Sequence, residues 1–101
     1  MGFLFNRPFR INYKIKKQVR FQDLVFVLFE PVGNISTNVS NLLAFDTKGC
    51  LCWVAEAPPA GNYSDFQIDE DINEIEANQG AATFYTIGMK DGKIRSVEMR
   101  K

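Results

Sequence analysis

Apolar and polar residues alternate along much of the chain, which is the pattern of half-buried β-strands. From Ile11 to Phe21 the alternation is broken at Lys17 alone, and it predicts a strand with a basic outer face. We expect one face to hold Ile11, Tyr13, Ile15, Val19 and Phe21, and the other Asn12, Lys14, Lys16, Gln18 and Arg20. The run Leu24–Phe29 is apolar throughout and predicts a central strand covered on both faces. Pro31 should end it, because proline cannot continue a central ladder.

Two turn sequences predict β-hairpins. Leu42–Phe45 and Cys50–Val54 flank Asp46–Gly49, in which an aspartate begins the turn and a glycine supplies a positive φ. Ala82–Ile87 and Lys93–Met99 flank an Asp-Gly pair, which is among the stronger short-range hairpin signals.

Residues 65–78 fit two interpretations. Ile68, Ile72 and Ile75 have helical spacing, and a capping box could begin a short helix before them. The same segment also divides into two short alternating runs around the acidic turn Asp69–Asp71. We favour two strands, because the neighbouring elements form a β-meander and a lone helix would need a face to cover.

The predicted fold is all-β, a single antiparallel meander of about seven or eight short strands that curls into a barrel or folds as a sandwich. The alternative is the same all-β fold with a short helix near 65–78 in place of two strands. A chain of 101 residues supports one core, so we expect a single domain over 1–101, with residues 1–10 as an N-terminal arm.

Several kinds of chemistry are excluded by composition. The chain has no histidine, so neither Ser-His-Asp nor Cys-His catalysis nor a histidine-ligated zinc site is available within one chain. Cys50 and Cys52 are expected to pack as small residues in a core strand, and strand geometry places them at the limit of disulfide reach. We therefore predict no cofactor, no metal site and no enzymatic activity. The contrasting hypothesis is an enzyme that uses scattered carboxylates, namely Asp46, Asp69, Asp71 and Glu74.

Location is predicted from the same features. No apolar run approaches the roughly 20 residues needed to cross a bilayer. The opening residues lack the pattern of a signal peptide. We therefore expect a cytoplasmic protein.

Charge is unevenly distributed although the formal net charge is zero. Residues 1–22 hold six basic residues and no acidic one, whereas residues 23–88 hold ten acidic residues against Lys48. The opposite charges could compensate one another within the fold, present a face to a partner, or bind a cation. The acidic turn lacks the glycine and the spacing of an EF-hand loop, which disfavours the cation.

The run Leu43-Ala44-Phe45-Asp46-Thr47-Lys48-Gly49-Cys50-Leu51-Cys52-Trp53 resembles the hairpin of a pyrroloquinoline-quinone-type propeller repeat. A degenerate second copy is formed by Tyr85–Ile87 followed by Asp91–Ile94. The order of elements is also similar to that of small uncharacterised bacterial all-β proteins. The resemblance implies antiparallel β-structure, and two blade-like units cannot close a propeller.

The sequence favours a non-catalytic protein-interaction domain that binds a protein partner or forms a homodimer. The alternative is a nucleic-acid-binding domain that uses the basic N-terminal strand, although a pI near 6.2 lacks the usual basic footprint. The candidate surface combines the aromatic arm, the basic strand and the acidic turn: Phe3, Phe5, Phe9, Lys14, Lys16, Arg20, Asp69, Glu70, Asp71 and Glu74.

Overall fold

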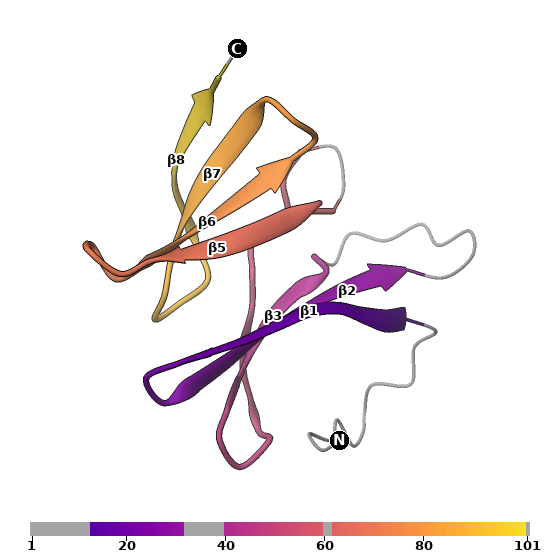
Figure 1. The fold of residues 1–101 in the computed structure, drawn as a ribbon, viewed down its shortest axis with the longest axis vertical. Coiled ribbons are helices and arrows are strands. Elements are labelled where there is room, and N and C mark those ends of the chain that lie inside the picture. Colours follow the sequence, from indigo (N-terminus) through magenta and orange to yellow (C-terminus); the bar gives the residue numbers. More distant parts are fainter. Residues whose placement is uncertain (1–12, 32–39, 60–61, 101) are drawn as a thin grey trace.

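Eight strands form two four-stranded antiparallel sheets in the computed structural model, which describes residues 13–31, 40–59 and 62–100 (Figure 1). Sheet A contains β1 (Tyr13–Phe21), β2 (Leu24–Pro31), β3 (Leu42–Asp46) and β4 (Leu51–Val54). Sheet B contains β5 (Asp65–Asp69), β6 (Glu74–Gln79), β7 (Thr83–Gly88) and β8 (Ile94–Met99). The strands of each sheet neighbour one another in chain order, so each sheet is a meander.

The all-β prediction is confirmed. Residues 65–78 form β5 and β6 and not a helix, and both predicted hairpins are present as β3–β4 and β7–β8. The described ranges contain no helix long and apolar enough to cross a membrane. The N-terminal arm, with Phe3, Phe5 and Phe9, lies outside the described residues.

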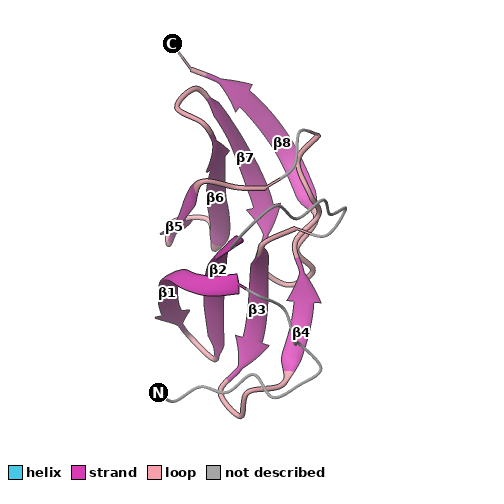
Figure 2. Cartoon of the chain, turned by 90° about the vertical axis from the view of Figure 1, so that its right-hand side faces the viewer, coloured by secondary structure: helices cyan, strands magenta, loops and turns pink. Residues whose placement is uncertain are grey.

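One hydrophobic core lies between the two sheets. Sheet A contributes Phe26 and Leu42, and sheet B contributes Phe66, Ile75 and Ile87, all of them at most 1% exposed. Each sheet buries one apolar face against the other, so each depends on the other to cover that face. The described strands do not close into a barrel, and the sheets remain two separate layers (Figure 2).

β2 is an interior strand and is buried on both faces, as its continuous apolar run predicts. Phe26 and Leu28 face the shared core. Val25, Val27 and Phe29 are buried on the opposite face, in a second cluster with residues of β3. β2 ends at Pro31, as expected.

The predicted faces of β1 are partly wrong. The register with β2 shifts between Ile15 and Lys17, so that Lys16 is an extra residue and the alternation changes phase there. Val19 and Phe21 pack against the shared core, but Ile15 lies on the other face and its side chain is 45% exposed. The bulge also explains the break in the pattern, because it turns Lys17 toward the core side of the sheet.

The prediction that Cys50 and Cys52 pack in the core is also wrong. Both are free thiols with exposed side chains. A register shift between Ala44 and Phe45 makes Cys52 an extra residue in β4, outside the pairing with β3. β4 is moreover the last strand of sheet A, so its residues have a neighbouring strand on one side alone.

The β3–β4 turn forms as its residues predict. Asp46 Oδ1 accepts hydrogen bonds from the backbone N–H groups of Lys48 and Cys50, at 2.8 and 2.9 Å. These donors, that of Cys50 first, hold the pKa of Asp46 below its ordinary value. Gly49 follows with a φ of 90°, a conformation that glycine adopts without strain.

Candidate functional site

The predicted surface residues occupy separate parts of the molecule. The basic members are exposed on β1: Lys14, Lys16 and Arg20. The acidic members surround the β5–β6 turn, where Glu74 is half-buried and the others are exposed: Asp69, Glu70, Asp71 and Glu74. The aromatic members of the predicted surface fall in the undescribed arm. No common site therefore follows from these residues.

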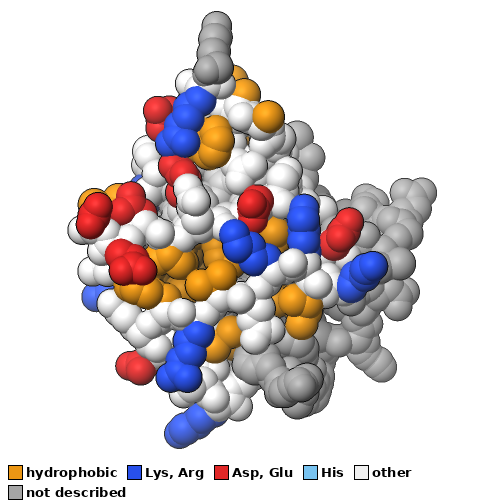
Figure 3. All heavy atoms as spheres, viewed as in Figure 1, with side chains coloured by type: hydrophobic (Ala, Val, Ile, Leu, Met, Phe, Trp, Pro, Cys, Tyr) orange, Lys and Arg blue, Asp and Glu red, His pale blue; other side chains and the backbone are white. Residues whose placement is uncertain are grey.

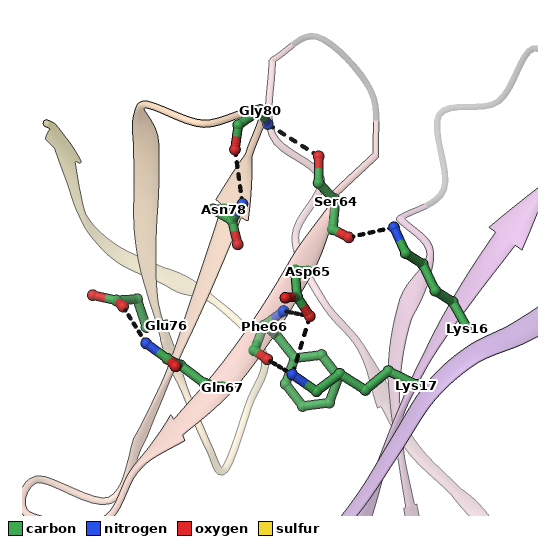
Figure 4. A network of polar contacts seen from close by, with 9 residues as sticks. All are labelled: Lys16, Lys17, Ser64, Asp65, Phe66, Gln67, Glu76, Asn78 and Gly80. Carbon is green, nitrogen blue, oxygen red and sulfur yellow. Dashed lines mark hydrogen bonds and ion pairs between the residues drawn. The ribbon is translucent and has the colours of Figure 1, made fainter. Parts of the chain in front are cut away.

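Part of the basic strand is used within the fold. β1 and β5 are both edge strands, and lysine side chains connect them across the gap between the sheets (Figure 4). Lys16 Nζ donates to the backbone oxygen of Ser64 at 2.8 Å. Lys17 Nζ donates to the backbone oxygen of Phe66 and to Asp65 Oδ1, the latter at 3.0 Å. Lys17 and Asp65 thus pair one basic and one acidic charge within the fold, as the first of the three hypotheses on the charge distribution predicts.

The electrostatics of this contact agree with its geometry. Burial raises the pKa of Asp65, but the hydrogen bonds from Lys17 and from the backbone of Phe66 outweigh it and leave the pKa below its ordinary value. Lys17 Nζ also lies 5.0 Å from the centroid of the Phe66 ring. Figure 3 also shows apolar side chains across the middle of this face of the molecule, between charged groups. We call the lysine-bridged gap between β1 and β5 the seam.

The acidic turn offers a shallow hollow. The hollow has a volume of about 400 Å³, and its lining includes Gln67, Asp69, Asp71 and Glu76. Asp69 Oδ1 accepts the backbone N–H of Asp71 at 3.1 Å, so this carboxylate stabilises its own turn. Within the described ranges no three Asp, Glu, Cys or His side chains are grouped so that they could hold a metal ion.

The four edge strands of the two sheets differ in what borders them. β1 and β5 face one another across the seam. The chain that follows β4 is tied to the β7–β8 turn, because the N–H of Glu56 donates to the backbone oxygen of Gly92 at 2.8 Å. Glu56 Oε1 also accepts a hydrogen bond from the N–H of Ile94 at 3.0 Å. Ile94 is the first residue of β8, so its backbone donor already has a partner. Beyond Ile94, no described strand borders β8 on its outer side.

The backbone of β8 presents unpaired groups along this edge. The N–H of Arg100 donates to Ala82 O on the β7 side at 2.7 Å. Backbone groups in an antiparallel ladder face the neighbouring strand at every second residue, and the register is regular from Ser96 to Met99. The N–H and C=O groups of Val97 and Met99 therefore point away from β7. We call these groups, with the side chains of residues 96–100, the β8 edge.

The side chains of the β8 edge are apolar on one face and charged on the other. Val97 is 54% exposed and Met99 70%, although both lie on the face of sheet B that carries the shared core. They are exposed because β8 extends beyond sheet A (Figure 2). On the opposite face, Arg100 lies 3.0 Å from Glu98, also contacts Glu76, and stacks over the ring of Phe84 at 4.0 Å.

This charged group holds two carboxylates and one guanidinium. The hydrogen bond from Arg100, and after it that from Gln67, lowers the pKa of Glu76 below its ordinary value. Arg100 is shared between the two carboxylates. The three side chains of Glu76, Glu98 and Arg100 together carry a formal charge of −1, and the more exposed carboxylate is Glu98, whose side chain is 64% exposed.

The β8 edge was missed by the reading of the sequence, which placed its candidates in the aromatic arm and the charged segments. A signal was present. The last strand of a meander is an edge strand, and in the predicted strand Lys93–Met99 two apolar residues alternate with a glutamate. What the pattern does not show is that sheet A ends before it reaches Val97 and Met99.

Comparison with known proteins gives a family and no activity. The family model described as "Domain of unknown function (DUF7957)" matches residues 6–99, which is most of the chain. The chain therefore belongs to this family. No curated protein and no solved structure matches it.

Proposed function

We propose that this member of the DUF7957 family is a non-catalytic protein-interaction module that binds an extended segment of a partner protein along the β8 edge. The observation that carries the proposal is the β8 edge itself, in which outward-facing backbone groups lie beside the exposed side chains of Val97 and Met99. Binding of this kind takes its affinity from main-chain hydrogen bonds and its specificity from alternate side chains.

The length and position of the β8 edge support this assignment. Natural proteins commonly shield edge strands with charges, bulges, prolines or covering loops. Here the seam lysines lie along β1 and β5, a bulge at Cys52 interrupts β4, and Glu56 covers the beginning of β8, whereas residues 96–99 are left accessible. The lysines of β1 give less support to nucleic-acid binding, because Lys16 and Lys17 donate to the backbone oxygens of Ser64 and Phe66. We also propose a cytoplasmic location, since the free exposed thiols of Cys50 and Cys52 suit a reducing compartment.

A proline at position 97 tests binding at the β8 edge without disturbing the hydrogen bonds of the sheet. The N–H of Val97 points away from β7, so Val97→Pro removes a donor from the β8 edge without removing one from the sheet. Glu98→Pro is the matched control: its lost N–H faces β7, so this variant should be destabilised. Circular dichroism and the fluorescence of Trp53 would confirm that Val97→Pro keeps the fold.

The test places a photo-crosslinking amino acid at position 99 in living cells of the natural host, with position 67 on the outer face of sheet B for comparison. The crosslinked partner segment is then identified, synthesised and titrated by fluorescence anisotropy. We expect Val97→Pro to weaken its binding at least tenfold and Val97→Ala to weaken it less. Equal crosslinking at the two positions, or an affinity that Val97→Pro leaves unchanged, would contradict the proposal.

A further inference from the structure

We infer that the segment bound by the β8 edge carries a lysine or arginine between two apolar residues, and that it is a segment of a partner protein and not the β8 strand of a second copy of this chain. The inference rests on the proposed function and adds the chemistry of the partner. It follows from three features of the β8 edge: the spacing of its free backbone groups, its two exposed apolar side chains, and the exposed carboxylate of Glu98, which shares Arg100 with Glu76.

The free backbone groups fix the register of an incoming strand. An antiparallel segment satisfies the N–H and C=O groups of Val97 and Met99 when two of its residues, spaced two apart, lie opposite them. The residue between those two then lies opposite Glu98. Any segment that uses all the open groups of this edge therefore places one defined side chain across from Glu98.

Apolar side chains are required at the two outer positions. Val97 and Met99 project to the same face, where they are 54% and 70% exposed. Directly opposite side chains on adjacent strands lie about 4.5–5.5 Å apart and make the main pairwise contacts of a sheet. A valine, isoleucine or phenylalanine opposite each of them would remove both from water.

A basic side chain is required at the middle position. Glu98 projects to the charged face, where Arg100 is its neighbouring cation at 3.0 Å and is shared with Glu76. Glu76, Glu98 and Arg100 together carry a formal charge of −1. A lysine or arginine opposite Glu98 would neutralise it, whereas an acidic residue there would add a like charge to a pair that is directly opposed.

The β8 strand of a second copy lacks this pattern, because it contains no basic residue between two apolar ones. Placing the two Met99 residues opposite each other would set Glu98 opposite Arg100, but it would leave Val97 without an apolar residue opposite it. Pairing through Val97 and Met99 in antiparallel orientation would put Glu98 opposite Glu98 of the other copy, which is a repulsive arrangement. Shifting the register so that the two Val97 residues oppose each other puts Met99 opposite Arg95. Arg95 lies where the β7–β8 register shifts, and its guanidinium already pairs with Asp91 and Glu74.

The experiment uses two fluorescein-labelled peptides of nine residues, Thr-Thr-Thr-Val-Lys-Val-Thr-Thr-Thr and the same sequence with glutamate in place of lysine. Anisotropy titrations with the full chain should show a roughly three- to thirtyfold preference for the lysine peptide at low salt, and the preference should shrink at high salt. Glu98→Lys should reverse the preference, and the control Glu98→Gln should abolish it. Val97→Pro should weaken binding of both peptides.

The outcomes separate the inference from the proposed function. If Val97→Pro weakens binding but Glu98→Lys leaves the preference unchanged, the partner chemistry is wrong and docking at the β8 edge stands. If Val97→Pro has no effect, or neither peptide binds at millimolar concentration, docking at this edge is wrong as well. If sedimentation shows a dimer of the native chain that Val97→Pro dissociates, a second copy is the occupant and the inference is overturned.

Discussion

At the scale of single residues, the contact between Gly92 and Trp53 joins the two sheets. A Cβ atom on Gly92 would lie 2.5 Å from Cε3 of the indole ring, and Gly92 has a φ of 73°. Trp53 Nε1 also donates to the backbone oxygen of Met89 at 3.0 Å, in the same turn. Gly92→Ala should therefore lower the free energy of unfolding by about 3 kcal/mol, because steric overlap adds to backbone strain. Urea denaturation measures this loss.

Gly80→Ala is the matched control for this prediction. Gly80 has nearly the same φ, 72°, but a Cβ atom there would meet no atom within 4 Å. We expect about 1 kcal/mol of destabilisation from the backbone alone. Equal losses for the two variants would show that the Trp53 contact contributes nothing beyond φ.

At the scale of strands, the seam makes Lys17 important for the contact between β1 and β5. Lys17→Met keeps the aliphatic chain but leaves the half-buried backbone oxygen of Phe66 and the carboxylate of Asp65 without their donor. The expected loss is about 1–3 kcal/mol. Gln18→Met, at an exposed position on the other face of β1, should change stability by less than about 0.5 kcal/mol. A Lys17 variant as stable as the Gln18 variant would show that the seam contact is energetically neutral.

The ion pair between Glu76 of β6 and Arg100, the residue after β8, predicts that stability depends on pH. The pKa of Glu76 is lowered in the folded chain, so its carboxylate stabilises the fold above the ordinary glutamate pKa of about 4.3. That contribution is lost as pH falls from this value through the lower pKa of the folded state. Glu76→Gln should therefore flatten the fall of Tm between about pH 5 and pH 3. A parallel decline in the two proteins would contradict the assignment to Glu76.

Elements defined by local sequence could be predicted, and features defined by pairing partners could not. The β3–β4 and β7–β8 hairpins form because their turns contain an aspartate and a glycine with a positive φ. The exposure of Ile15 depends on a bulge that arises from the pairing of β1 with β2. Cys52 is exposed because β4 is the last strand of sheet A. Val97 is exposed because β8 extends beyond the end of sheet A. None of these is a property of the local pattern, which is why the candidate site was placed elsewhere.

At the scale of the whole molecule, neither sheet has an independent means of covering its core face. Phe26 and Leu42 of sheet A are buried together with Phe66 and Ile87 of sheet B. Separation of the sheets would expose both faces at once, so the chain should unfold in one cooperative step. Trp53 belongs to sheet A, touches the turn of sheet B and is the chain's one tryptophan, which makes its fluorescence a reporter of the contact between the sheets.

The prediction is that Trp53 fluorescence and far-ultraviolet circular dichroism give the same midpoint and the same m-value in urea. Phe66→Ala should lower both midpoints together, because the cavity it leaves, costing about 3–5 kcal/mol, lies in the core that the two sheets share. Ser96→Ala, on exposed β8, should leave both midpoints nearly unchanged. If the fluorescence transition came first and the circular dichroism persisted to higher urea, the sheets would be separate folding units. The β8 edge would then have to be tested on sheet B alone.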